Sequence, residues 1–225
     1  QTTACSARDQ GKYDWRNMAI NYSELQSEIG DWLNRSDLTA VIPTFISLAE
    51  VGLERVLRVR QMMERANATI DTQYSALPSD FLEAKTFKLT STSPLQPVSF
   101  ATIDEMDDFD SRTTASGRPL YFTIVGNQIR VHPLPDGNYT GELTYYGKIP
   151  RLSASITTSW LLTSSPDAYL YGALLQAAPY LKDDERLNVW STLYASAVQG
   201  MQTSDDRSAT TGGALKARAT PFGAR

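Results

Sequence analysis

The chain has 225 residues, of which 41% are hydrophobic and 20% charged, a balance typical of a globular protein rather than a disordered or fibrous one. It holds one histidine, His132, and one cysteine, Cys5, which excludes a zinc site built from several His and Cys ligands and an intramolecular disulfide. The formal net charge is −4, unlike the basic surface of a DNA-wrapping protein. These counts favour binding or architecture over catalysis.

The compartment is indicated by what the sequence lacks. No stretch approaches the roughly 18 apolar residues that cross a bilayer. The first residues, Gln1 to Cys5, do not show the charged-then-apolar layout of a signal peptide. We therefore expect a protein made in a reducing cytoplasm.

Residues 1–21 mix polar and small side chains without a sustained period and are expected to form a tail. A helix follows, because Ser23 and Gln26 have the spacing of a capping box, which pairs two backbone N–H groups at a helix start. Its apolar stripe is Leu25, Ile29, Trp32 and Leu33.

A second helix is predicted from Pro43, which suits a first helical turn because its missing N–H costs nothing there. Glu54 and Arg58 are expected to form an i,i+4 pair on its outer side. Helical residues continue as far as Glu64, so residues 22–66 are predicted to be the first part of a helical bundle.

The middle of the chain, residues 67–160, is predicted to be an inserted, β-rich domain. Thr102 and Glu105 form a second capping box before a short helix. Gly126 with Asn127 predicts a hairpin turn. The expected strands have aromatic and β-branched content and cover residues 81–89, 120–125, 128–132 and 141–147. The last three are expected to form a meander that packs against a helical core.

The C-terminal part, residues 161–203, is predicted to be the second part of the helical bundle. Ser165, Pro166 and Asp167 mark one helix start, and Asp183 is expected to cap the last helix. That helix shows apolar residues at spacings of three and four, namely Leu187, Trp190, Tyr194, Ala197 and Met201.

Residues 204–225 are expected to form an extended arm. Residues 207–225 carry four basic residues and no acidic one, with Leu215 and Phe222 among them. Such a segment can order on a partner, its apolar residues acting as anchors and its charges meeting an acidic surface. The fold class predicted for the whole chain is therefore α+β, an α-helical bundle with an inserted small antiparallel β-domain and an extended C-terminal arm.

The acidic cluster on the short helix is the main candidate for acid–base or calcium chemistry; its members are Asp104, Glu105, Asp107, Asp108 and Asp110. It lacks the glycine turn and alternating ligands of a calcium loop. We interpret it as a solvated helix whose start is favoured by the helix dipole. His132 has no nucleophile motif around it and is expected to be structural or on the surface.

The strand aromatics, Tyr121, Phe122, Tyr145 and Tyr146, could form a stacking platform for bases or sugars. Alternation along a strand instead predicts that half are core and half surface. No phosphate-binding glycine loop occurs in the sequence. We therefore predict no catalytic residue, no metal and no cofactor.

The order of these features resembles the head-to-tail adaptor (connector) proteins of short-tailed phages, the group that includes tail tubular protein A. The likeness covers about residues 19–203. Its carriers are the helix openings at Tyr22–Leu25 and Phe45–Glu50, the Leu77–Glu83 turn, the Ile129–Pro135 hairpin, Leu143–Tyr146, Pro166–Leu175 and the Trp190 helix.

The resemblance implies a non-enzymatic virion protein, assembled in the host cytoplasm and located at the head-to-tail interface. It implies a ring of twelve copies beneath the portal protein that contacts the tail nozzle and possible tail fibres, with double-stranded DNA passing through its centre during ejection. It also implies an extended stretch over residues 60–72. In that family the C-terminal arm reaches the portal, which makes Ala214, Leu215, Lys216, Arg218 and Phe222 the predicted portal-binding residues.

Two other functions remain open from the sequence. One is a cell-wall hydrolase that uses the acidic cluster around Asp104 and Asp108. The other is a carbohydrate or host-surface binding module that uses the strand tyrosines.

Overall fold

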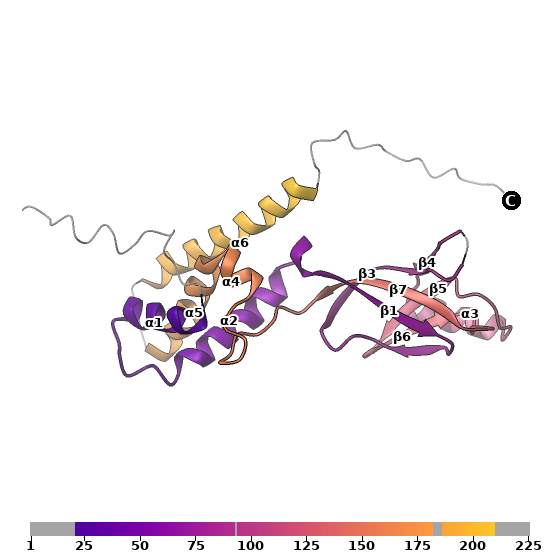
Figure 1. Cartoon of the computed structure of the whole chain (residues 1–225), viewed down its shortest axis with the longest axis horizontal. Coiled ribbons are helices and arrows are strands. Elements are labelled where there is room, and N and C mark those ends of the chain that lie inside the picture. Colours follow the sequence, from indigo (N-terminus) through magenta and orange to yellow (C-terminus); the bar gives the residue numbers. More distant parts are fainter. Residues whose placement is uncertain (1–20, 93, 182–185, 210–225) are drawn as a thin grey trace, which may run out of the picture. The chain divides into compact units, whose positions relative to one another are not determined.

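The computed structural model describes residues 21–92, 94–181 and 186–209 (Figure 1). The chain divides into two compact units, which we call the helical unit and the sheet unit. The helical unit comprises Gln1–Arg60 and Ile149–Arg225, and the sheet unit comprises Gln61–Lys148. The fold class is α+β, as the sequence predicts.

The helices of the described residues are α1 (Tyr22–Leu33), α2 (Ile42–Val56), the short 3₁₀ helix η2 (Arg60–Met62), α3 (Ile103–Arg112), α4 (Trp160–Ser164), α5 (Pro166–Leu181) and α6 (Leu187–Ala209). The strands are β1 (Met63–Ile70), β2 (Tyr74–Ala76), β3 (Phe81–Leu89), β4 (Gln96–Phe100), β5 (Tyr121–Val125), β6 (Gln128–His132) and β7 (Tyr139–Gly147).

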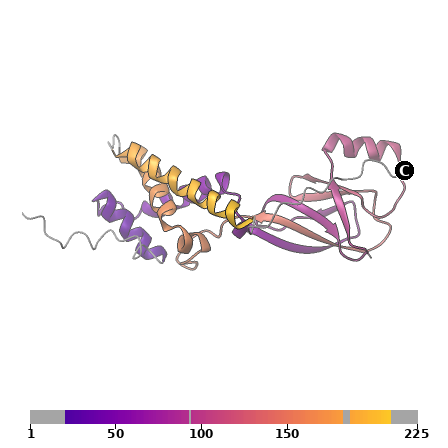
Figure 2. The same ribbon diagram turned by 90° about the horizontal axis from the view of Figure 1, so that it is seen from above.

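The helical unit is built around α5, which packs against α1, α2, α4 and α6 (Figures 1 and 2). Buried residues lie all round α5 and include Tyr169, Leu170, Ala173 and Leu174. A helix that is apolar on all sides is stable only when other helices cover it. Pro43 lies in the first turn of α2 and Pro166 opens α5, as their missing N–H groups predict.

The start of α1 differs from the prediction. Asn21 is the N-cap, and its Oδ1 accepts a hydrogen bond from the Glu24 backbone N–H at 3.0 Å. Ser23 is already inside the helix, so its expected capping box with Gln26 is wrong. The side chain that first reaches a free N–H of the turn decides where the helix begins. Of the expected apolar face, Leu25, Ile29 and Leu33 are buried, whereas Trp32 is half-buried.

The outer side of α2 is also different from the prediction. Glu54 is buried together with Glu50, and its carboxylate lies 3.6 Å from the Arg151 guanidinium. Arg58 lies beyond the helix end and donates hydrogen bonds to the backbone carbonyls of Glu54 and Leu57. The expected Glu54–Arg58 pair on the outer side is therefore wrong, because Glu54 lies on the buried side of α2.

The last helix, α6, is longer than its hydrophobic pattern indicates. The pattern fades after Gln202, but the helix continues to Ala209, through the first residues of the predicted arm. Asp205 fixes this last part, because its carboxylate accepts a hydrogen bond from the Arg60 backbone N–H at 2.9 Å. Asp183, the predicted cap, lies outside the described residues.

The sheet unit contains a seven-stranded sheet in the order β1-β7-β3-β4-β5-β6-β2, nearly closed into a barrel because its edge strands β1 and β2 approach one another. The β5–β6 hairpin is confirmed, with Gly126 in the left-handed conformation that its turn requires. The three-strand meander is wrong, because β7 pairs with β1 and β3 instead of β6. The purely antiparallel description is also wrong, since β4 and β5 are parallel.

The stretch after α2 is largely extended, as the family resemblance implies. The helix-forming residues in this stretch predict a helix instead. After η2, strand β1 pairs along its whole length with β7, from Met63 opposite Tyr146 to Ile70 opposite Tyr139. Long-range backbone pairing has overridden local propensity here.

The sheet encloses its own hydrophobic core, formed by residues such as Phe87, Leu89, Phe122, Val131 and Leu143. The Phe87 and Phe122 rings have centroids 5.4 Å apart. We expected this sheet to rest on a helical core, but its strands bury their apolar side chains against each other.

The short helix α3 lies on the outer side of the sheet, beside β5 and β6 (Figure 2). Its capping box is confirmed, with reciprocal hydrogen bonds between Thr102 and Glu105. Met106 is its buried apolar anchor.

Candidate functional site

The acidic cluster on α3 attaches this helix to the sheet. Asp107 and Asp110 face β6, where the Arg130 guanidinium bridges both carboxylates at 2.6 and 2.5 Å. Gln73 also donates to Asp110, at 2.8 Å. We call Asp107, Asp110, Arg130 and His132 the α3 clasp.

His132 belongs to this clasp. Its Nδ1 lies 2.6 Å from the Asp110 carboxylate, and its ring stacks on Phe109 with a centroid distance of 5.6 Å. The side chain is buried, which confirms the expected structural role. Arg130 and His132 were predicted to lie on a polar face, and α3 is what covers that face.

The electrostatics of the clasp do not suit an acid catalyst. Burial alone would raise the pKa of Asp110, but the hydrogen bonds from Arg130 and His132 outweigh it and lower that pKa. A general acid at neutral pH needs the opposite shift. Asp104 is exposed, and Asp108 forms an exposed i,i+4 ion pair with Arg112, so neither lies in a site that would tune a carboxyl group.

The strand aromatics divide as alternation predicts. Phe122 and Tyr145 are buried, while Tyr121 and Tyr146 are half-buried. The Tyr145 hydroxyl donates to Asp80 at 3.1 Å, and burial with this carboxylate raises the pKa of Tyr145 to about 12. The Tyr121 ring packs against the Phe109 ring, with a distance of 4.7 Å between the two ring centroids. These four rings do not form one exposed stacking surface.

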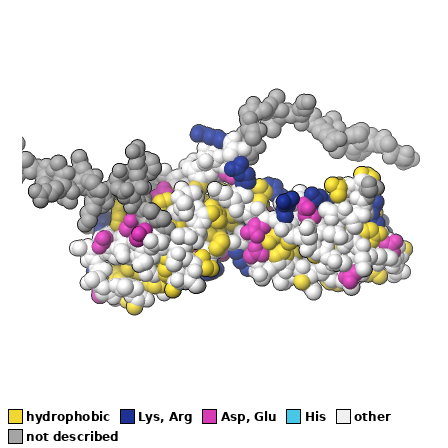
Figure 3. Space-filling view, viewed as in Figure 1, with side chains coloured by type: hydrophobic (Ala, Val, Ile, Leu, Met, Phe, Trp, Pro, Cys, Tyr) yellow, Lys and Arg dark blue, Asp and Glu magenta, His cyan; other side chains and the backbone are white. Residues whose placement is uncertain are grey.

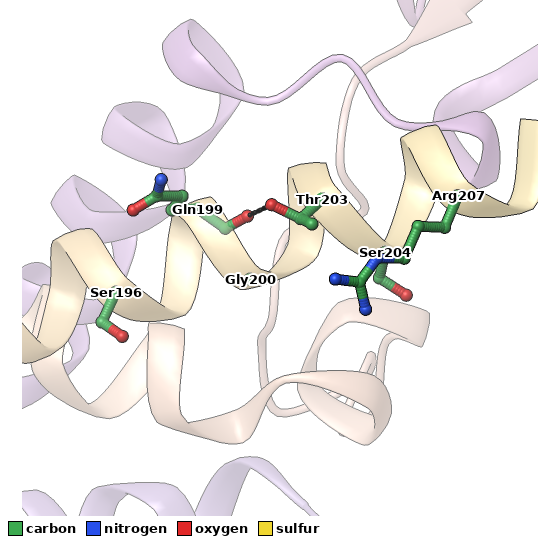
Figure 4. Close-up of a pocket in the computed structure, with 6 residues that line it drawn as sticks. All are labelled: Ser196, Gln199, Gly200, Thr203, Ser204 and Arg207. Atoms are coloured by element: carbon green, nitrogen blue, oxygen red, sulfur yellow. Dashed lines mark hydrogen bonds between the residues drawn. The ribbon is translucent and has the colours of Figure 1, made fainter.

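The outer face of α6 is the clearest exposed surface of the helical unit. Trp190 and Val198 are buried on the inner side of α6. On the outer face, the side chains of Val189 and Leu193 are 58% and 36% exposed. Continuing at spacings of three and four, this face becomes a shallow hollow lined by Ser196, Gln199, Gly200, Thr203, Ser204 and Arg207 (Figure 4). A Cβ at Gly200 would meet no atom within 4 Å. Exposed apolar and small side chains on one helix face are typical of protein contacts.

Other hydrophobic side chains also reach the surface of the helical unit. Leu48 and Val56 on α2, and Tyr180 on α5, are about half exposed. In the view of Figure 3 such side chains appear as separate patches among polar atoms. They add to the exposed apolar area that a monomer leaves in water.

The predicted portal-binding residues, Ala214, Leu215, Lys216, Arg218 and Phe222, all lie outside the described residues, so their role stays a prediction. Residues 1–17 lie outside them as well.

The sequence analysis missed one polar site, the buried pair of Glu50 and Glu54. The sequence indicates this pair only by its position on α2. Glu50 follows Ala49 and Glu54 follows Leu53, so each glutamate borders the apolar stripe of buried residues. Charged side chains at a stripe edge usually point to solvent, which is why the pattern did not reveal them.

The described residues contain no group of three or more His, Cys, Asp or Glu side chains arranged to hold a metal ion. None of the helices they form is both long and apolar enough to cross a membrane.

Comparison with known proteins decides the family. Residues 20–217 match the SU10 adaptor protein family, which covers both units and most of the chain. The chain belongs to the SU10 adaptor protein family. This membership indicates a structural adaptor role in a phage particle. No curated protein is detectably similar to the chain. The finer likeness to tail tubular protein A stays a prediction.

Proposed function

We propose that this SU10 adaptor family member is a non-enzymatic virion protein that forms a ring of twelve copies between the portal protein and the tail nozzle. The family match over residues 20–217 is the observation that carries the proposal. Head-to-tail contacts repeated by rotation close a ring. The exposed apolar face of α6 is consistent with assembly, because association would remove it from water.

The charge distribution suits a conduit for genome DNA. The sheet unit has seven basic and eleven acidic residues and so carries −4, while the helical unit has fourteen of each and is neutral. A protein without excess positive charge makes few phosphate contacts, and such contacts would slow a passing duplex. DNA therefore passes through the ring without specific binding.

The C-terminal arm is proposed to dock on the portal, with Leu215 and Phe222 as apolar anchors and Lys216 and Arg218 as the charges that meet an acidic surface. Docking on the portal orders the arm and brings further copies of the chain together. The assembled copies then display the surface that the tail nozzle binds. Burying an anchor of this size is worth about 1.5–3 kcal/mol.

A truncation after Ala209 tests the arm without shortening α6. A cut after Thr203 would also remove the Asp205 carboxylate that caps Arg60, and loss of docking could then follow from a damaged helix. We expect the chain that ends at Ala209 to remain folded and monomeric and to lose portal binding. Sedimentation and native mass measurement of portal mixtures check both points.

Point variants sharpen the test. Leu215→Ala with Phe222→Ala should weaken portal binding at least 30-fold, because about 2 kcal/mol or more of anchor burial is lost. Thr210→Ala with Thr211→Ala, in the same arm, is the matched control and should bind normally. A truncated chain that still forms rings on the portal would disprove the role of the arm, and failure of the intact chain to assemble with portal would disprove the adaptor ring.

A further inference from the structure

Two carboxylates are buried one helical turn apart on α2. Glu50 is 1% exposed and Glu54 is 8% exposed, and their i,i+4 spacing places them on the same helix face. We call them the carboxylate pair. Like charges at such a site disfavour each other, and burial disfavours the ionised form of Glu50.

The pair holds the segment that returns from the sheet unit. This return segment, residues 149–159, has no helix or strand of its own. The Leu152 backbone N–H donates to Glu50 Oε1 at 2.8 Å, and Arg151 lies 3.6 Å from Glu54 Oε2. The pair is thus the polar anchor of an otherwise irregular segment.

A third element joins the same anchor. The Tyr169 hydroxyl, on α5, lies 3.4 Å from Glu50 Oε1 and 3.4 Å from the Ser159 hydroxyl at the other end of the return segment. Burial raises the pKa of Tyr169, so this hydroxyl keeps its proton and remains a donor. Glu50 therefore links α2, α5 and the return segment.

The charges of this anchor do not balance. Among the described residues, the groups that contact the pair are the Arg151 cation, the neutral Tyr169 hydroxyl and the Leu152 backbone N–H. The Arg58 guanidinium donates to the backbone carbonyls of Glu54 and Leu57, among other contacts. Within the part of the chain that the structure describes, Glu54 Oε1 is buried and has no hydrogen-bond partner. One proton taken up by the pair would remove the negative charge that the Arg151 guanidinium leaves unbalanced.

We propose that the carboxylate pair is a proton-linked clasp: uptake of one proton by the pair fastens the return segment to α2 and α5, and loss of that proton loosens it. This conformational device goes beyond the adaptor role and does not depend on it. Desolvation raises the pKa of Glu50, and the charge of Glu54 raises it further, although the Leu152 N–H and Arg151 oppose this shift.

The sign of the pH dependence follows. A carboxyl group whose pKa is raised in the closed state binds its proton more tightly there than when the segment opens. The added protection is complete below the ordinary Glu pKa of about 4.3 and is lost as the pH rises through the raised value. The return segment should therefore be held more firmly in mild acid than at pH 8.

Amide hydrogen exchange of the full chain between pH 4.5 and 8, corrected for the intrinsic exchange rate, tests the clasp. Protection of the Leu152 amide should increase several-fold as the pH falls, because the Glu50 carboxyl binds its proton more tightly in the closed state. The Leu143 amide in the sheet core should not follow it. A flat Leu152 profile in the wild-type chain would overturn the proposal.

Two variants separate proton linkage from packing. Glu50→Gln removes the ionisable group while keeping its shape and an acceptor oxygen, so it should flatten the Leu152 profile at the level that the wild type reaches in acid. Glu54→Gln removes only the neighbouring charge that raises the pKa of Glu50, so the profile should keep its pH dependence and move its midpoint to lower pH. Asp31→Asn, at an exposed position of α1, is the matched control and should keep the wild-type profile. If the control flattens the profile as well, or Glu50→Gln does not, the pair is not the titrating element.

Discussion

At the scale of single residues, the α3 clasp shows how one carboxylate can attach a helix to a sheet. Asp110 accepts hydrogen bonds from Arg130, His132 and Gln73, while the carboxylate of its neighbour Asp108 pairs with Arg112 on the helix surface. Arg130 is buried, and its Nε has no hydrogen-bond partner among the described residues. The buried Arg130 guanidinium therefore relies on the Asp107 and Asp110 carboxylates for its hydrogen bonds.

Replacing Asp110 should expose this dependence. We expect Asp110→Ala to lower the free energy of unfolding by about 1–3 kcal/mol, because it leaves buried donors unpaired. The matched control Asp108→Ala should cost only about 0.3–0.5 kcal/mol, as exposed i,i+4 pairs do. Urea denaturation of the full chain measures both changes. If the two variants lose the same free energy of unfolding, the α3 clasp does not stabilise the fold.

The Asp110 contribution should also depend on pH. Its pKa is lowered in the folded protein by Arg130 and His132, against the effect of burial, so the stabilisation is present above the ordinary Asp pKa of about 3.9. It is lost as the pH falls through the lowered value. The stability difference between wild type and Asp110→Ala should thus be larger at pH 5 than in stronger acid.

At the scale of elements, the position of β7 between β1 and β3 requires a glycine. A Cβ at Gly141 would lie 2.7 Å from the Phe87 ring and 3.0 Å from the Ile70 side chain. Phe87 is itself packed on Phe122, so the ring cannot move away freely. The pairing of β7 with its two neighbours therefore leaves no room for a side chain here.

Gly141→Ala is expected to lower the free energy of unfolding by about 1–3 kcal/mol through overpacking. Gly137→Ala is the matched control, because a Cβ there meets nothing within 4 Å; we expect a change within about 0.5 kcal/mol. Thermal and urea unfolding of both variants check the difference. A neutral Gly141→Ala would mean that the core of the sheet unit is looser than its geometry indicates.

At the scale of the whole molecule, the sheet unit is an insertion whose two ends leave the sheet side by side. Met63, at the start of β1, is paired with Tyr146, near the end of β7. Insertions with adjacent ends disturb the host fold little and can fold alone when they own a core. The sheet unit has such a core.

A fragment of residues 61–148 should therefore unfold cooperatively by itself. A fragment of residues 67–160, with the boundaries that the sequence suggests, should be less stable, because it lacks the part of β1 that pairs with Leu143 to Tyr146 and gains the return segment. Circular dichroism melting curves and amide spectra compare the two. Equal stability would show that the first half of β1 is dispensable.

Local chemistry allowed much of this fold to be predicted. The Thr102–Glu105 capping box, Pro43 in the first turn of α2 and the hairpin at Gly126 depend on groups within four residues of each other. Apolar periodicity likewise predicted the buried residues of α1. These features can be read from the sequence because few alternatives compete with them at short range.

Only the tertiary structure decided the remaining features. Strand pairing joins residues some eighty positions apart, such as Met63 and Tyr146, and propensity carries no information about such partners. The burial of Glu50 and Glu54 depends on Arg151, Leu152 and Tyr169, which come from distant segments. The sequence by itself determined the existence of α1, α2, α3, α5 and α6, the hairpin and a composition poor in catalytic groups. Tertiary contacts decided which polar residues are buried and which strands meet, because both depend on neighbours that are distant in the chain.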